Sequence, residues 1–166
     1  MKVQFIAVPI ALALCAPAGW AQSSAQQSFD ALKTLVGKWQ GKDTLGHRVT
    51  VTFRLTAKGS ALLSEFVESG ENEDMITMIH LDGDRLLATH YCSAGNQPRL
   101  SAAISPDVKT VTFDFMDGTN LPAPQSGHMQ RLVIRIPSAG HHIEEWTYVE
   151  NGKEDTVVSD VRRVKP

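Results

Sequence analysis

A long series of short segments, in which apolar and polar residues alternate, sets the strongest limit on the fold of this chain. The clearest segment, residues 49–55, reads V-T-V-T-F-R-L. A period of two is typical of β-strands that bury one face. Asp82-Gly83 and Asn151-Gly152 separate neighbouring segments, and such pairs favour tight hairpin turns. The pattern therefore predicts antiparallel strands that follow one another along the chain.

One helix and about ten strands are expected. Apolar residues at helical spacing predict the helix over residues 24–36. The strands are predicted over residues 38–42, 49–55, 61–67, 75–81, 85–92, 100–104, 110–116, 129–136, 143–150 and 155–164, so that strands fill the range 38–164.

A sheet of this size has to hide its edges. Open edges invite pairing with other chains, and closure into a barrel removes them. We therefore expect an all-β fold, an antiparallel up-and-down barrel of about ten strands with one short N-terminal helix. Ten strands enclose more room than side chains alone readily fill, so a ligand cavity is expected as well.

Residues 1–21 have the features of a signal peptide. They carry a lysine at position 2, an apolar run, and small residues at the positions that precede cleavage after Ala21. A lipid anchor at Cys15 is the alternative, and it is disfavoured because Leu14 is not small. We expect a single domain over residues 22–166, exported to the periplasm or the medium, with no later segment apolar enough to cross a membrane.

Charge and cysteine content exclude several classes of partner. The chain has 16 basic and 18 acidic residues, and losing Lys2 with the signal peptide changes its net charge from −2 to −3. A weakly acidic chain without a basic cluster argues against binding nucleic acid or anionic membranes. The mature chain keeps only Cys92, so no internal disulfide is possible.

Two features resemble the calycin superfamily, which comprises lipocalins and fatty-acid-binding proteins. Gly37-x-Trp39 follows the short helix, and Arg162-Arg163 stands in the last strand. The resemblance implies that Trp39 packs at the closed end of the barrel and that one of the two arginines stacks on its ring in a cation–π contact. It also implies a small apolar or amphipathic ligand. The segment 89–99 is similar to small exported bacterial proteins of an uncharacterised lipocalin-like type.

The G-x-W-x-G sequence at residues 37–41 is also similar to the start of nitrobindin-type haem barrels. That resemblance implies a haem ligand late in the chain, near His141 or His142. The match stops at Lys42-Asp43, where a further glycine is expected. No cofactor is therefore predicted, and haem binding is kept as an alternative function.

Candidate ligand contacts concentrate in segment 89–99. His90 and Cys92 share one face of a strand, and polar loop residues follow them. Arg99 suits a ligand carboxylate, as in fatty-acid-binding proteins. His128 lies at the start of one further predicted strand and Glu65 on another, and the side chain of each faces either the interior or the exterior of the barrel. The candidate ligand contacts are therefore His90, Cys92, Asn96, Gln97, Arg99, His128 and Glu65. We expect the ligand to bind near these residues and away from Trp39.

Catalysis and metal binding have weaker support. A histidine beside a thiol can generate a thiolate nucleophile, so an enzyme that uses the His90/Cys92 face is a further alternative. No third orienting group is visible, and no catalytic residue is predicted. The six histidines are scattered, and His90 with Cys92 supplies too few ligands for zinc, so no metal site is predicted.

Overall fold

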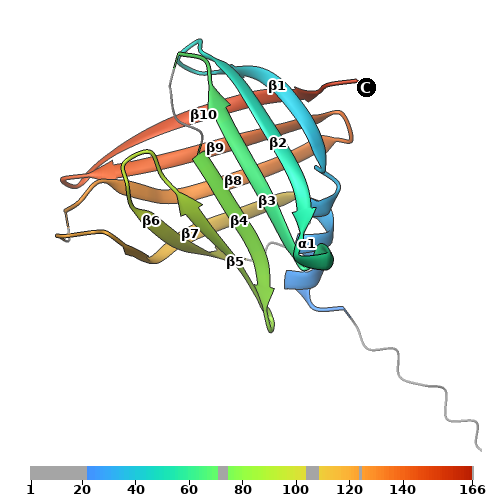
Figure 1. Cartoon of the computed structure of the whole chain (residues 1–166), viewed down its shortest axis with the longest axis horizontal. Helices are drawn as coiled ribbons and strands as arrows, with labels where there is room; N and C mark the ends of the chain where they lie inside the picture. Colours follow the sequence, from blue (N-terminus) through green and yellow to red (C-terminus); the bar gives the residue numbers. More distant parts are fainter. Residues whose placement is uncertain (1–21, 71–74, 104–108, 124, 166) are drawn as a thin grey trace, which may run out of the picture.

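The chain folds into a closed barrel of ten antiparallel strands. A computed structural model describes residues 22–70, 75–103, 109–123 and 125–165. The predicted signal peptide, residues 1–21, lies outside the described residues. Each strand pairs with its neighbours in the chain, and the first strand also pairs with the last. The predicted fold class is therefore confirmed, and Figure 1 shows the barrel from the side with the helix at one end.

The elements are short and follow the predicted order. They are α1 (Ser24–Lys33), β1 (Gly37–Asp43), β2 (Arg48–Thr56), the 3₁₀ turn η1 (Ala57–Gly59), β3 (Ala61–Glu68), β4 (Met75–Asp82), β5 (Arg85–Tyr91), β6 (Gln97–Ala103), β7 (Thr110–Thr119), β8 (His128–Ser138), β9 (His141–Glu150) and β10 (Lys153–Arg163).

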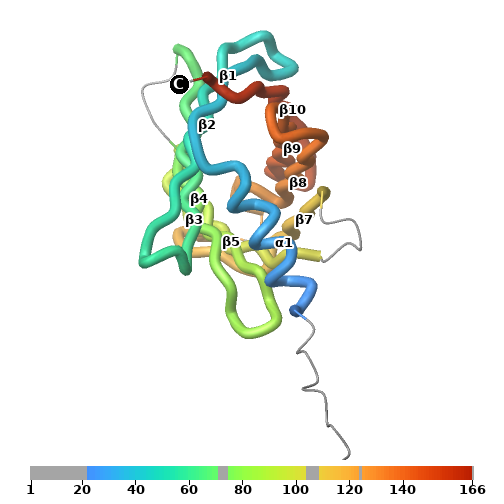
Figure 2. The backbone as a smooth tube through the Cα atoms, turned by 90° about the vertical axis from the view of Figure 1, so that its right-hand side faces the viewer, coloured from blue at the N-terminus to red at the C-terminus, as the bar shows by residue number. Residues whose placement is uncertain are grey.

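The helix α1 crosses one end of the barrel, where it meets β4 and β5 (Figure 2). The Ser23 side chain caps its N-terminus by accepting a 3.2 Å hydrogen bond from the backbone N–H of Gln26. Phe29 and Leu32 point into the core. The helix ends at Lys33, three residues before the predicted end at residue 36, because the chain must turn there before β1 begins at Gly37.

Trp39 forms the centre of the contact between α1 and the barrel. The residue is fully buried, and its indole Nε1–H donates a 2.7 Å hydrogen bond to the Leu35 carbonyl. The guanidinium of Arg163 lies 4.1 Å from the ring centroid, as the cation–π contact requires. The predicted stacking is therefore present, and Arg163 rather than Arg162 makes it, since neighbouring residues of a strand face opposite sides of the sheet.

β6 is longer than the alternation of apolar and polar residues predicts. It begins at Gln97 rather than at residue 100, and it pairs as far as Gln97–Thr119 with an extended β7. The register between β6 and β7 shifts between Arg99 and Leu100, as at a β-bulge. Arg99 pairs with Asp117 and Leu100 with Phe115, so the extra residue of the bulge is Met116 of β7, and the period of two is broken in β7.

A single apolar core fills the barrel on the side of α1. Its largest fully buried side chains include Trp39, Phe29, Phe53, Phe113 and Leu132. Helix residues and strand residues belong to one contiguous cluster. No helix in the described part of the chain is long and apolar enough to cross a membrane.

Candidate functional site

A cavity of about 110 Å³ opens between the strands β3 to β5 and the strands β8 to β10. It is partly open to solvent, and most of its wall is apolar. Trp39 is not among its lining residues, which are Phe66, Glu68, Met75, His90, Met129, Trp146, Val157 and Ser159.

His90 is one of three polar residues that line the cavity, with Glu68 and Ser159. It lies on β5 opposite Thr77 of β4, and only 2% of its surface is exposed. Its Nδ1 is 2.9 Å from the Thr77 Oγ1, and its ring lies 4.5 Å from that of Trp146 at an angle of 41°. Burial lowers the pKa of His90 to about 4, because desolvation disfavours the charged ring. The imidazole is therefore neutral at pH 7.

The second ring nitrogen of His90 lacks a partner. Its Nε2 is buried and makes no hydrogen bond to any residue that the structure describes. A buried polar atom without a partner costs about 1–3 kcal/mol. The Thr77 hydroxyl can either donate to Nδ1 or accept from it, so Nε2 can present a lone pair or an N–H group. A ligand with one donor or acceptor would satisfy it in either tautomer.

The buried pair of His142 and Glu144 fixes the position of Trp146, which lines the cavity. Glu144 is 2% exposed, and its Oε1 lies 3.1 Å from His142 Nε2. Its Oε2 accepts a 3.3 Å hydrogen bond from the Trp146 indole N–H. The His142 ring in turn packs edge-on against Trp39 and Phe53, with centroids 4.5 Å and 5.5 Å apart. The core beside α1 is therefore connected through Glu144 to the aromatic face beside His90.

The loop residues predicted to join His90 lie elsewhere. Asn96 is buried and donates a 2.8 Å hydrogen bond to the Gly127 carbonyl. The side chain of Gln97 accepts hydrogen bonds from Thr119 and Asn120. These contacts fix the turn after β5 against the end of β7 and against the residue before β8, and neither side chain lines the cavity.

Arg99 and Cys92 are also separate from His90. Arg99 pairs with Asp117 through two 2.5 Å contacts on the exposed side of the sheet. Cys92 closes the turn after β5, where its N–H donates to the Asn96 carbonyl and its own carbonyl accepts from Gly95. Within the described ranges no hydrogen bond joins Cys92 to His90, so the geometry offers no pair of thiol and base.

His128 and Glu65 occupy two further environments. His128 is buried against Phe115, and its two ring nitrogens lie 2.8 Å from the Ser126 carbonyl and 3.2 Å from the Gln130 Oε1. It lines a different depression of the surface. Glu65 lies on the outer face of β3, because its neighbour Phe66 lines the cavity. Of the predicted ligand contacts, only His90 lines the cavity.

The remaining cavity residues could not be identified as a group from the sequence. Met75, Met129 and Trp146 stand out as large apolar residues, yet core packing explains them equally well. Val157 and Ser159 carry no signal of their own. The ends of strands distant in the sequence meet here only because the barrel closes.

Comparisons with known proteins support the fold and assign no family. The protein of unknown function from the DUF3598 family of Nostoc punctiforme is similar with a TM-score of 0.56 and 12% identity, over 80% of this chain and 49% of that one. The chain thus spans about half the length of the Nostoc protein. Rv2717c from M. tuberculosis is similar with a TM-score of 0.56 and 15% identity, over 84% of this chain and 98% of that one. No protein-family model matches the chain, and no curated protein matches its sequence. At such low identity, the likeness shows a shared barrel fold.

Proposed function

We propose that this protein is an exported barrel that binds a small apolar or amphipathic molecule in the cavity beside His90. The observation that carries the proposal is that His90, whose buried Nε2 has no hydrogen-bond partner among the described residues, lines a mostly apolar cavity. Ligand sites of this kind combine apolar walls with a few polar groups that orient the ligand. The contact between Trp39 and Arg163 further supports the resemblance to calycins.

The size of the cavity limits the ligand. Its volume of about 110 Å³ is below the roughly 300–1,000 Å³ of common ligand pockets. It is closer to an engineered apolar cavity of about 150 Å³ that binds benzene. The ligand class is therefore a single aromatic ring, or a chain of similar width, with one polar atom for His90. Met75 and Met129 line the open cavity, and their flexible side chains can adapt to a longer molecule.

Phenol and toluene form a matched pair of probes, since they differ mainly in one hydroxyl group. We expect both to bind the mature protein, measured by titration while NMR follows the Trp146 indole N–H signal. In His90→Phe, the ratio of phenol affinity to toluene affinity should fall by about 2- to 10-fold, the value of one hydrogen bond.

The double variant Thr77→Val/His90→Phe is the control for this test. It removes both polar partners at once, so Thr77 is not left with an unpaired hydroxyl. It should show the same reduced affinity ratio as His90→Phe. An unchanged ratio in both variants, or no binding of either probe to the wild-type protein, contradicts the proposal.

Haem fits the described residues poorly. His90 Nε2 has the chemistry of an axial haem ligand, but the cavity is smaller than ordinary cofactor pockets. The histidines that the nitrobindin resemblance implies have other partners, because His142 faces Glu144 and His141 faces Asp160. A Soret band on adding haem to the purified protein would contradict this interpretation.

Export is a separate part of the proposal, and it depends on residues 1–21. Cleavage after Ala21 is expected to leave Gln22 as the first residue of the secreted form. Mass determination of protein recovered from the periplasm or the medium tests this. An intact N-terminus or a lipid on Cys15 would contradict it.

A further inference from the structure

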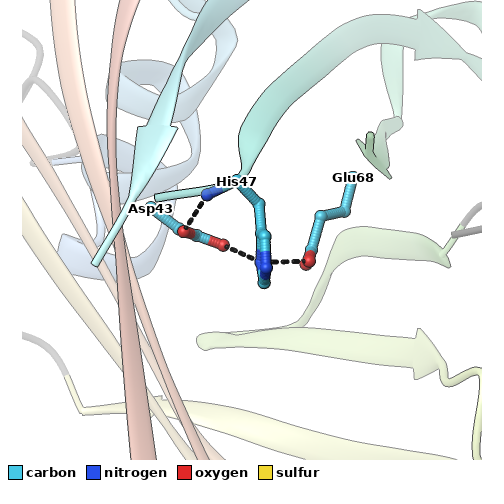
Figure 3. A group of neighbouring side chains, drawn as sticks. All are labelled: Asp43, His47 and Glu68. Carbon is cyan, nitrogen blue, oxygen red and sulfur yellow. Dashed lines mark hydrogen bonds and ion pairs between the residues drawn. The ribbon is translucent and has the colours of Figure 1, made fainter. Parts of the chain in front are cut away.

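Three potential metal ligands converge at the rim of the barrel, beside the cavity. Asp43 ends β1, His47 lies in the turn before β2, and Glu68 ends β3 (Figure 3). One ligand atom from each of these residues lies within 4.8 Å of the other two. Glu68 lines the cavity, and Asp43 pairs across the sheet with Ser159, which also lines it.

Both carboxylates approach the same ring nitrogen. His47 Nδ1 is 2.5 Å from Glu68 Oε1 and 3.3 Å from Asp43 Oδ2. An imidazole nitrogen carries at most one hydrogen, so it can donate to only one of the two oxygens. Asp43 Oδ2 is indeed without a hydrogen-bond partner among the described residues. The Asp43 side chain is fully buried, where an unpaired carboxylate oxygen is costly.

The turn after β1 holds the Asp43 carboxylate in place. Its Oδ1 accepts hydrogen bonds of 2.9 Å from the backbone N–H groups of Leu45 and His47. These bonds leave Oδ2 directed at the imidazole of the same turn (Figure 3). The backbone of the turn therefore holds Asp43 Oδ2 next to His47 Nδ1, and Oδ2 accepts no hydrogen bond from the described residues.

We propose that Asp43, His47 and Glu68 bind a divalent transition-metal ion, with Zn²⁺ preferred over Mg²⁺ and Ca²⁺. One nitrogen and two carboxylate ligands suit Zn²⁺, whereas Mg²⁺ and Ca²⁺ prefer oxygen alone. Tetrahedral ligands about 2.1 Å from zinc lie about 3.4 Å apart, and the Asp43 and His47 atoms are already 3.3 Å apart. Glu68 is partly exposed, so it can move back by the further ~1 Å that the ion needs.

Three protein ligands leave a fourth position open. Zinc sites with three protein ligands hold water or substrate there. Because Glu68 belongs to both the cluster and the cavity wall, the proposed metal site adjoins the cavity. The metal site can be tested separately from the proposed binding at His90, because Asp43 and His47 do not line the cavity.

Zinc affinity of the untagged mature protein tests the proposal, measured by competition with a chromophoric zinc indicator. We expect one Zn²⁺ per chain, with millimolar Mg²⁺ or Ca²⁺ failing to displace it. Asp43→Asn, His47→Gln and Glu68→Gln should each weaken zinc binding at least tenfold. Asparagine keeps the Oδ1 acceptor of the turn, and the other two side chains are partly exposed, so all three variants should fold.

Asp160→Asn is the matched control. His141 Nε2 lies 3.1 Å from both oxygens of Asp160, but no second carboxylate approaches it among the described residues. This variant, and Cys92→Ser, should bind Zn²⁺ within twofold of wild type. The proposal is overturned if wild type binds no zinc at unit stoichiometry, if His47→Gln and Glu68→Gln bind as wild type does, or if only a control variant loses the ion.

Discussion

Among single residues, His90 gives the barrel a defined response to acid. Its pKa in the unfolded chain is near 6.5, and burial lowers the folded-state pKa to about 4. The unfolded chain therefore binds more protons between these two pH values. The contribution of His90 to stability is fully present above pH 6.5 and is lost as the pH falls towards 4.

We predict that His90→Phe weakens the acid sensitivity of folding. The fall in unfolding free energy between pH 7 and pH 4 should be about 3 kcal/mol smaller in the variant than in wild type. Urea denaturation at each pH measures the difference, and the NMR titration of the His90 ring gives its midpoint directly. Equal pH dependence of the two proteins, or a midpoint near 6.5, would show that the ring is solvated.

Among the elements, the pairing of β1 with β10 closes the barrel, and Gly41 permits it. A Cβ atom at this position would lie 1.9 Å from the Asp160 carbonyl oxygen and 2.9 Å from the Val161 Cα. Both are backbone atoms of β10, so a rotamer change cannot relieve the clash. The glycine is required for close approach of the two strands.

Gly41→Ala should therefore destabilise the barrel by about 2–3 kcal/mol, comparable to overpacking a core. Gly140→Ala is the control, because a Cβ atom at position 140 would meet no neighbouring atom within 4 Å, and surface substitutions change stability by only about 0.5 kcal/mol. Thermal and urea unfolding of both variants measure the effect. Similar stability of the two would mean that β10 moves away from β1 at little cost.

Across the whole molecule, Arg163 links the end of the described chain to its beginning. The guanidinium donates 2.7 Å hydrogen bonds to the carbonyls of Thr34 and Val36, which are 129 and 127 residues away. The same group stacks on Trp39. It thus caps the carbonyl groups after α1 and covers the closed end of the barrel.

Arg163→Ala should cost roughly 2 kcal/mol, because it removes charged hydrogen bonds and a cation–π contact together. Arg162→Ala removes the same side chain from the exposed face of β10 and should cost at most about 0.5 kcal/mol. Urea unfolding of the two variants compares them. Equal losses of stability would indicate that the positive charge on β10, and not the stacking of Arg163 on Trp39, contributes to the free energy of unfolding.

The number and order of the strands, the short helix and the closure could all be predicted from the sequence. Alternating residues such as those of 49–55 report which face of a strand is buried, and a large antiparallel sheet must close to hide its edges. The pairing of Trp39 with one of the two arginines was implied by the resemblance to calycins. The choice of Arg163 over Arg162 was not, since it depends on the register of β10 against β1.

Which polar residues meet depends instead on how the closed barrel packs. His90 and Arg99, both in segment 89–99, diverge because Arg99 pairs with Thr89, which faces the side of the sheet opposite to His90. Residues from distant segments converge, as Asp43, His47 and Glu68 do at the rim. The alternation of apolar and polar residues shows which face of a single strand is buried. Which side chains meet in a binding site depends on the stagger between neighbouring strands, and this stagger is determined by the closure and packing of the barrel.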